Sequence, residues 1–306
     1  MNQLNDLSGA WSAAPTPLTE SLAIDVASVR RMVKHHINLK QNGMFIGGTC
    51  GEGPWLPRKD MRRLTEVTAA ATGGKINVAV QVTDNSFTKV LEHVKEGKAD
   101  GADIAIVAEP WFAGPMRPEC VEEHYLKIAE KSVLPVGIYS RGAAFVPLSV
   151  YSKVLRHENV CLFKDSSLND DIMKLALAIA AKRELCVLTG YELGMVKYLA
   201  AGYDGVLAGG GALIGGLTVK MVEAARQQDT AQLNRLQAHC DKINYAAYGG
   251  RKIKSWLTGL KYALVKMDIF STTAGYLRYP LSKTAVANIE RMIIKQQKII
   301  LPYKCR

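Results

Sequence analysis

The apolar positions of this chain fall into short runs of three to six residues, separated by longer amphipathic segments. Short apolar runs bounded by turn residues are typical of buried strands. We predict eight strands, at Ser12–Pro17, Gly43–Gly47, Asn77–Val82, Ile104–Val107, Val136–Tyr139, Cys161–Phe163, Cys186–Thr189 and Gly205–Ala208.

The segments between these runs have helical periodicity and are long enough for crossover helices. They are Ile24–Leu39, Arg58–Thr72, Ser86–Gly97, Pro118–Lys131, Leu148–Arg156, Asp170–Lys182 and Leu193–Ala201. Alternating strands and helices of this number predict an α/β fold, a (β/α)8 TIM barrel of ordinary size. We place the barrel, with its active site, at residues 1–229.

The composition changes after the eighth run, where few β-forming residues remain. Helical periodicity continues over Thr230–Tyr248, Lys252–Met267 and Ser282–Gln297. We therefore predict a C-terminal helical extension over residues 230–306, which packs on the barrel or on a neighbouring subunit.

Size and composition describe an ordinary globular protein, with 306 residues, 48% hydrophobic and 22% charged. No stretch approaches the roughly 20 apolar residues of a membrane span. The N-terminal segment lacks the basic and apolar regions of a signal peptide. We expect a cytoplasmic protein without a membrane association.

Cysteine, histidine and charge patterns argue against several other classes. The six cysteines lack CxxC spacing, and His35 and His36, being adjacent, do not share a helix face. We predict reduced thiols, no metal and no cofactor. The formal charge is +11, but the lysines and arginines form no run of five or six, so we expect no nucleic-acid partner.

Lys164 is the most informative residue, because it ends the apolar run Val160–Phe163 and precedes Asp-Ser-Ser. An amine held in an apolar wall can lose its proton near neutral pH and attack a carbonyl carbon. Two other runs, Gly43–Gly53 and Leu134–Gly142, also end in small polar residues or a single tyrosine. In a barrel the carboxyl ends of strands meet at one mouth, so these three ends should converge.

The order Gly-Gly-Thr-Cys-Gly-Glu, Ile-Tyr-Ser-Arg and Phe-Lys-Asp-Ser-Ser resembles the dihydrodipicolinate synthase and N-acetylneuraminate lyase superfamily. This group contains class I aldolases, lyases and dehydratases. The resemblance implies that Lys164 forms a Schiff base with pyruvate or another 2-oxo acid and that Tyr139 moves protons. It implies that Thr49 and the backbone of Cys50 hold the carboxylate, for which exposed backbone N–H groups are suited.

The resemblance also implies contacts with substrate at Gly48, Ser166, Gly190 and Leu207, and a homo-oligomer, a tetramer or a dimer. Glu52 has a structural interpretation, in which it bonds loop amides beneath the site. Cys50 stands where relatives carry a second hydroxyl, and a thiol is a weaker donor.

Three further positions depart from the synthases within this superfamily. Phe112 stands where they have a proton-relaying tyrosine, and Ala144 where they have an arginine for the second substrate. The segment Tyr-Ser-Arg-Gly-Ala is instead similar to that of 5-dehydro-4-deoxyglucarate dehydratases. Arg141 is therefore either a clamp for a distal carboxylate or half of a surface salt bridge. We do not expect a standard dihydrodipicolinate synthase.

The segment Thr-Gly-Tyr-Glu resembles one in N-acetylneuraminate lyases whose acidic residue accepts hydroxyl groups. Glu192 is therefore either a polyol acceptor or a carboxylate at a helix N-terminus. The Gly209–Ala212 run matches a small-residue loop over the site in this superfamily.

Taken with the resemblance, these residues predict a Schiff-base lyase that reversibly cleaves a 2-oxo-3-deoxy sugar acid, or a related 2-oxo acid, to pyruvate and an aldehyde. The alternatives are a 5-dehydro-4-deoxyglucarate-type dehydratase, a dihydrodipicolinate synthase-like protein with altered or lost activity, and a non-catalytic binder of 2-oxo acids.

Overall fold

A closed barrel of eight parallel strands forms the centre of the molecule. The computed structural model describes residues 6–112, 116–141 and 146–304. The strands pair in chain order, and the first closes the barrel against the last. They are β1 (Gly9–Ala13), β2 (Gly43–Ile46), β3 (Asn77–Gln81), β4 (Ile104–Ala108), β5 (Val136–Ser140), β6 (Val160–Asp165), β7 (Cys186–Thr189) and β8 (Gly205–Ala208). The (β/α)8 prediction is confirmed.

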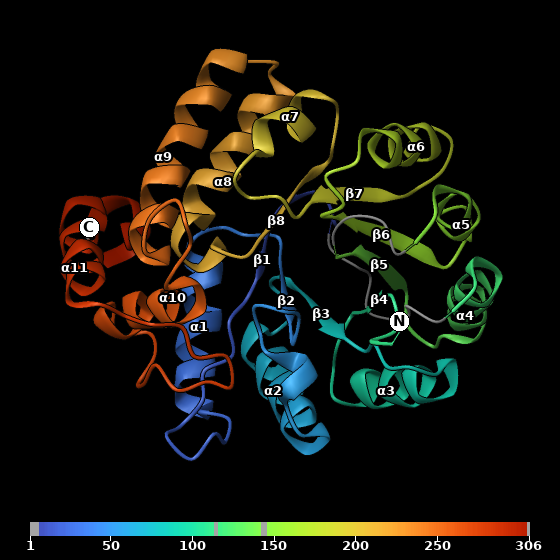
Figure 1. Cartoon of the computed structure of the whole chain (residues 1–306), viewed down its shortest axis with the longest axis horizontal. Helices are drawn as coiled ribbons and strands as arrows, with labels where there is room; N and C mark the ends of the chain where they lie inside the picture. The colour runs from blue at the N-terminus through green and yellow to red at the C-terminus, as the bar shows by residue number, and fades with distance from the viewer. Residues whose placement is uncertain (1–5, 113–115, 142–145, 305–306) are drawn as a thin grey trace.

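Helices surround the barrel as an outer ring, which Figure 1 shows in a view with the strands at the centre. They are α1 (Val26–Asn38), α2 (Arg58–Thr72), α3 (Phe87–Ala99), α4 (Pro118–Lys131), α5 (Leu148–Val154), α6 (Asp170–Ala180), α7 (Met195–Ala200) and α8 (Gly211–Arg226). A short 3-10 turn, η1 (Gly53–Trp55), precedes α2. The seven predicted crossover helices are present, with ends that differ by up to two residues.

The strands are apolar throughout because each is covered on both faces, by the barrel interior and by the helices. All five residues of β4 are fully buried, and so are Trp11, Phe45 and Phe163, of which Phe163 packs outward against Tyr151 of α5. Most of the buried polar and charged side chains of the strands lie near the carboxyl ends, as Lys164 and Asp165 do in β6. This arrangement concentrates the chemistry of the chain at one mouth of the barrel.

The first strand lies earlier than its predicted range of Ser12–Pro17. It runs over Gly9–Ala13, where Gly9 pairs with Gly205 of β8 and Trp11 with Gly43 of β2. Pro15 and Pro17 lack the N–H that a parallel ladder needs, so the segment containing them follows the strand instead. This correction leaves Ala13 at the mouth of the barrel.

Helix α8 begins within the Gly209–Ala212 run, which the resemblance implied to be a loop over the site. Gly211 and Ala212 already belong to the helix, so only Gly209 and Gly210 form a connection. Glycine is needed because a Cβ on Gly211 would lie 2.7 Å from the Ser12 side chain, and one on Gly215 would lie 1.8 Å from Gln41. The glycines that weaken the helical signal therefore let α8 pack closely against the barrel.

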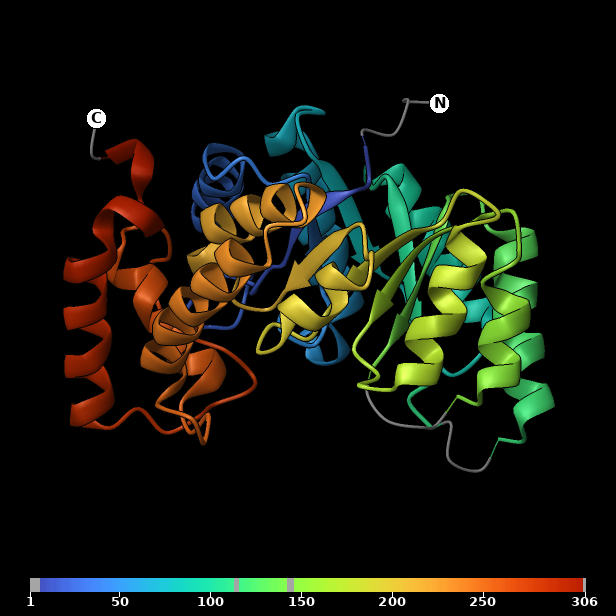
Figure 2. The ribbon, with the colours of Figure 1, turned by 90° about the horizontal axis from the view of Figure 1, so that it is seen from above.

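The remaining helices are α9 (Thr230–Tyr248), α10 (Trp256–Lys266) and α11 (Lys283–Ile300), followed by the 3-10 turn η2 (Pro302–Lys304). Helix α9 packs along α8, and α11 packs on both α9 and α10. Figure 2 shows these helices at one side of the barrel, with α11 outermost. The predicted second helix, Lys252–Met267, begins four residues later, at Trp256. The division of the chain into residues 1–229 and 230–306 stays a prediction.

None of the helices in the described part of the chain is both long enough and apolar enough to cross a bilayer.

Candidate active site

Lys164 is buried at the mouth of the barrel, with 5% of its surface exposed. It pairs in register with Tyr139 of the neighbouring strand β5. The Nζ atom lies 3.9 Å from the centre of the Tyr139 ring and 5.1 Å from the centre of the Phe45 ring. The amine is therefore enclosed by two aromatic rings, one of which carries a hydroxyl group.

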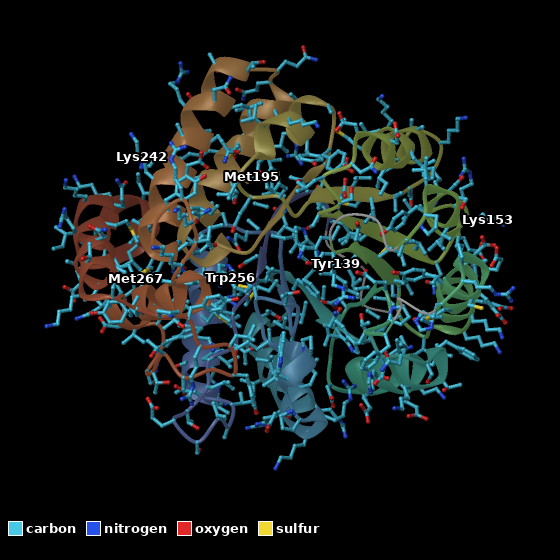
Figure 3. The ribbon with its side chains drawn as sticks, in the orientation of Figure 1. Tyr139, Lys153, Met195, Lys242, Trp256 and Met267 are labelled. Atoms are coloured by element: carbon cyan, nitrogen blue, oxygen red, sulfur yellow. The ribbon has the colours of Figure 1, made fainter. Side chains whose placement is uncertain are left out.

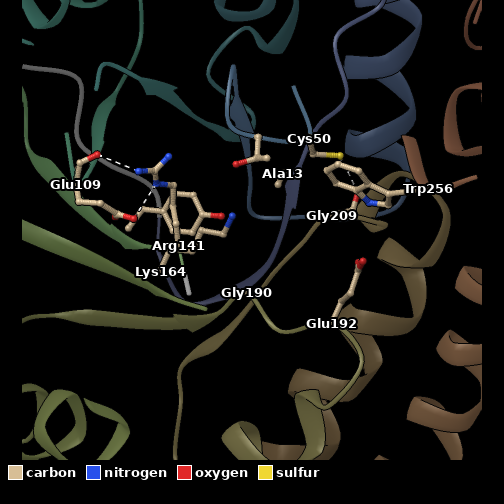
Figure 4. Close-up of a pocket in the computed structure, with 11 residues that line it drawn as sticks. Ala13, Cys50, Glu109, Arg141, Lys164, Gly190, Glu192, Gly209 and Trp256 are labelled. Carbon is tan, nitrogen blue, oxygen red and sulfur yellow. Dashed lines mark hydrogen bonds and ion pairs between the residues drawn. The ribbon is translucent and has the colours of Figure 1, made fainter. Parts of the chain in front are cut away.

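A cavity of about 520 Å³ opens above this amine, within the usual size for a small-molecule site. Figure 4 shows it with the side chains that line it, and Figure 3 shows that Tyr139 and Trp256 lie toward the middle of the molecule. The lining residues come from nearly every part of the chain: Ala13, Thr49, Cys50, Glu109, Tyr139, Arg141, Lys164, Gly190, Glu192, Gly209 and Trp256.

The Thr49–Cys50 turn forms one wall of the cavity. The N–H of Glu52 donates to the carbonyl of Thr49 at 3.2 Å, and that of Gly53 to the carbonyl of Gly48 at 3.2 Å, which closes the turn. The thiol of Cys50 points at the carbonyl of Gly209 with a sulfur–oxygen distance of 3.6 Å, a weak contact. Burial, reinforced by the negative charge of Glu192, raises the pKa of this thiol to about 12.

Glu52 anchors this turn from behind. Its Oε2 accepts the backbone N–H groups of Tyr276 at 2.5 Å and Leu277 at 2.9 Å, and its Oε1 pairs with the ammonium of Lys261. Both members of the ion pair are almost completely buried. The structural interpretation of Glu52 is confirmed, with amides from the C-terminal segment as its partners.

Arg141 lies in the cavity wall but is already paired. Its Nε donates to Oε1 of Glu109 at 3.0 Å, and its Nη2 donates to the main-chain carbonyl of the same residue at 3.2 Å. The guanidinium also stacks on the ring of Trp111, at 4.5 Å from the ring centre. Arg141 is thus a salt-bridge partner that also faces the cavity, and its role as a clamp for a distal carboxylate stays a prediction.

Glu192 lines the cavity on the other side from Arg141, as Figure 4 shows. Its Oε2 accepts the N–H of Gly210, the N-cap of α8, at 2.6 Å, and its Oε1 accepts the hydroxyl of Tyr248 at 2.9 Å. Burial raises the pKa of this carboxyl, and the two hydrogen bonds oppose the rise. Glu192 thus stands at a helix N-terminus, that of α8, and it faces the cavity, while its role as a polyol acceptor stays a prediction.

The other residues predicted to contact the substrate differ in whether they line the cavity. Gly190 lines the cavity, and a Cβ there would lie 2.1 Å from Oγ of Ser166 and 2.9 Å from Cε of Lys164, so only glycine fits. The Ser166 hydroxyl lies next to Gly190. Gly48 is buried against the Phe45 ring, and Leu207 is fully buried in β8. Among the described residues, these last three do not form part of the cavity wall.

Sequence reasoning missed three side chains of the wall: Ala13, Glu109 and Trp256. Glu109 follows β4 directly, as Lys164 ends the apolar part of β6, so the same strand-end signal pointed to it. Trp256 begins α10 in the C-terminal extension and packs edge-on against Tyr279, with ring centres 5.5 Å apart. Nothing in its local sequence indicates that it reaches the barrel mouth.

Phe112 and Ala144 are the two other departures from the synthases that the sequence indicated, besides Arg141. Phe112 is 77% exposed, and its N–H donates to the side chain of Asn85 at 3.0 Å. Ala144 lies outside the described residues. Within the described ranges, no group of three or more His, Cys, Asp or Glu side chains is placed to hold a metal ion.

Comparison with known proteins gives this cavity its context. Residues 6–295 match the model of the dihydrodipicolinate synthetase family. The chain belongs to this family. Membership supports a lyase of the Schiff-base-forming class I aldolase type that uses pyruvate, and it confirms the resemblance drawn from the motifs.

Individual relatives are distant. A 4-hydroxy-tetrahydrodipicolinate synthase from Chlorobium luteolum is 25% identical over 293 residues, which cover 93% of this chain and 96% of the relative. A dihydrodipicolinate synthase structure from Bacteroides thetaiotaomicron matches with a TM-score of 0.84 at 24% identity, over 95% of this chain and 99% of that one. A Clostridium difficile protein, CdNal, solved in complex with mannosamine, matches with a TM-score of 0.83 at 17% identity, over 95% and 99%. These two structures share the fold of this chain.

Proposed function

We propose that this chain is a Schiff-base lyase that reversibly cleaves a 2-oxo-3-deoxy sugar acid, or a related 2-oxo acid, to pyruvate and an aldehyde. The observation that carries the proposal is the placement of Lys164. It is a buried amine at the floor of a 520 Å³ cavity, beside the only tyrosine among the residues described as lining it. A class I aldolase needs this pairing of a nucleophilic amine with a proton-transfer group.

The chemistry follows from this placement. The amine of Lys164 attacks the 2-oxo carbon, and loss of water gives an iminium that can accept electrons. The C4 hydroxyl then loses its proton, the bond between C3 and C4 breaks, and the electron pair moves into the iminium to form an enamine. The aldehyde leaves, the enamine takes a proton at C3, and water releases pyruvate. Tyr139 is the proposed proton carrier, since a phenol can donate and accept.

The Thr49–Cys50 turn is the proposed binding site for the 2-oxo acid carboxylate. Its position in the cavity wall is consistent with this role. The Cys50 thiol contributes at most a weak hydrogen bond. We therefore propose that backbone N–H groups and the Thr49 hydroxyl supply most of the binding to the carboxylate.

A 5-dehydro-4-deoxyglucarate-type dehydratase is the second candidate. It shares every step up to the iminium and differs in the bond that breaks next. The presence of Arg141 in the cavity wall favours it, because a guanidinium can bind a distal carboxylate in a bidentate manner. For either reaction we expect a homodimer or homotetramer, which light scattering of the purified protein would measure.

The test is covalent trapping. The protein is incubated with pyruvate and borohydride, and its intact mass is measured. We expect one stable adduct in the wild type and none in Lys164→Ala. Lys153→Ala is the matched control, because Lys153 lies on α5 at the periphery, paired with Glu122. It should form the adduct normally. An adduct that persists in Lys164→Ala would contradict the assignment. No adduct with any 2-oxo acid would favour a protein that only binds such acids.

A further inference from the structure

Four charged side chains line the cavity within the described part of the chain. Glu109 and Glu192 are acidic, and Arg141 and Lys164 are basic. With all four ionised, their charges sum to zero. The first carboxylate of a substrate is assigned to the Thr49–Cys50 turn, and a second carboxylate would need a cation other than Lys164 that is free to bind it.

The second cation, Arg141, is not free. Two of its three guanidinium nitrogens donate to Glu109, one to the carboxylate at 3.0 Å and one to the main-chain carbonyl at 3.2 Å. The stacking on Trp111 fixes the plane of the guanidinium further. Figure 4 shows the pair side by side at one end of the cavity, with Cys50, Trp256 and Glu192 at the other end.

The Glu109 carboxylate has one oxygen that can still accept a hydrogen bond. Only 7% of the residue is exposed, and its Oε1 is paired with Arg141. Its Oε2 is buried and has no hydrogen-bond partner among the described residues. A buried carboxylate oxygen without a donor is costly, and an ionised carboxylate can only accept. A ligand that supplies a hydroxyl group would satisfy it, after a small turn of the carboxyl group toward the cavity.

We propose that Glu109 is a specificity-determining residue, which makes the cavity select an aldehyde portion that is neutral and polyhydroxylated and reject one that carries a second carboxylate. This inference rests on the proposed function and chooses between its two candidates, in favour of aldol cleavage of a sugar acid. A second carboxylate would face the charge of Glu109, and like charges at close range oppose binding strongly.

The closeness of Glu109 to Arg141 also favours a neutral hydroxyl group over an ammonium group on the substrate. Any group that reaches the Glu109 carboxylate also comes close to the Arg141 guanidinium, which lies at hydrogen-bond distance from it. An ammonium would be repelled by that cation. A hydroxyl can donate to Glu109 and accept from Arg141, so it fits both members of the pair.

The experiment compares two aldehydes that differ in one group. Glyceraldehyde ends in a hydroxymethyl group, and tartronate semialdehyde has a carboxylate in its place. Each is condensed with pyruvate, and kcat/KM is measured for the wild type, Glu109→Gln and Glu109→Asp. Glutamine keeps the shape and the oxygen that Arg141 needs but removes the charge. Aspartate keeps the charge.

We expect the wild type to favour glyceraldehyde by at least about tenfold. In Glu109→Gln that preference should fall about a hundredfold, because a charge-assisted hydrogen bond to glyceraldehyde is lost and a repulsion of tartronate semialdehyde is removed. Glu109→Asp should keep the wild-type direction. The matched control is Glu290→Gln, which removes the same charge from an exposed pair with Lys266 on α10 and should leave the preference unchanged.

Borohydride trapping with pyruvate separates this inference from the proposed function. If the wild type forms no adduct, both fail. If the wild type and Glu109→Gln trap pyruvate equally, the Schiff-base lyase stands. A wild-type preference for tartronate semialdehyde, an unchanged preference in Glu109→Gln, or no turnover with either aldehyde would then overturn the role of Glu109 alone.

Discussion

The loss of one partner from the buried ion pair between Lys261 and Glu52 should lower the stability of the folded protein by an amount that can be worked out. Lys261 lies on α10, and Glu52 follows the Thr49–Cys50 turn of the barrel. Their side chains are 2% and 0% exposed. The ammonium also donates to the carbonyl of Ala274 at 2.7 Å. The perturbation we choose is Lys261→Met, which keeps an unbranched side chain of similar length but removes the charge.

The expected loss in the free energy of unfolding follows from the charge of Glu52, which stays buried when its partner is removed. Removing one partner of a buried pair costs about 3–5 kcal/mol, because the other charge stays buried without compensation. Glu52 keeps two amide donors, from Tyr276 and Leu277, so the lower end of that range, about 3 kcal/mol, applies. For a domain somewhat smaller than this one, about 2 °C of melting temperature is lost per kcal/mol. We expect a fall of about 6 °C.

The assay is differential scanning calorimetry of four proteins, together with the KM for pyruvate. Lys266→Met is the matched control, since Lys266 lies on the same helix but pairs with Glu290 in the open, at 44% and 41% exposure. It should not change the melting temperature measurably. The double variant Glu52→Gln with Lys261→Met should recover part of the loss, because no unpaired charge remains. We also expect a higher KM in Lys261→Met, because the turn proposed to bind the substrate carboxylate loses its anchor. Equal melting temperatures for Lys261→Met and Lys266→Met would refute this reasoning.

Two further predictions concern titrating groups in the cavity. Because burial raises the pKa of Glu192, kcat/KM should fall as the pH drops through that raised value. Tyr248→Phe removes a donor that stabilises the carboxylate, so it should move this acid limb to higher pH. A pH–rate profile whose acid limb does not move would count against Glu192 as a hydrogen-bond acceptor for the substrate. Because burial raises the pKa of the Cys50 thiol to about 12, iodoacetamide at pH 8 should leave it unmodified in the folded protein and label it after unfolding, as peptide mass spectrometry would measure. The half-buried Cys120 should be labelled earlier, and modification of Cys50 at an equal rate would contradict its burial.

The barrel could be predicted from the sequence because its strands have a clear pattern of apolar residues. Each is an apolar run bounded by turn residues, and the helices between them are amphipathic. The placement of Lys164 beside Tyr139 followed from the same logic, since parallel strands bring their carboxyl ends together. Pairing in register could not be derived from composition, but strand order in a barrel places the ends of β5 and β6 next to each other.

Other features depended on contacts between segments far apart in the chain. Helix α8 was obscured by glycines whose reason is the close approach of Ser12 and Gln41, which no local pattern contains. The pairing of Arg141 with Glu109 depends on two loops that meet only in the folded barrel. A sequence can show that Arg141 is available at a strand end, but only the fold shows that another side chain already occupies its donors.

Side chains of the C-terminal helices line the cavity or support the residues that line it. Trp256 of α10 lines it, Tyr248 of α9 bonds the carboxylate of Glu192, and Lys261 of α10 holds Glu52 beneath the Thr49–Cys50 turn. Cys50, Trp256 and Glu192 lie at the end of the cavity away from Glu109 and Arg141, which directly follow β4 and β5 of the barrel. Changes in the C-terminal helices should therefore act first on the Thr49–Cys50 turn and on Glu192. The proposed discrimination between aldehydes should instead depend on Glu109 and Arg141, at the ends of β4 and β5. The two ends of the cavity can then vary independently, because different parts of the chain support them.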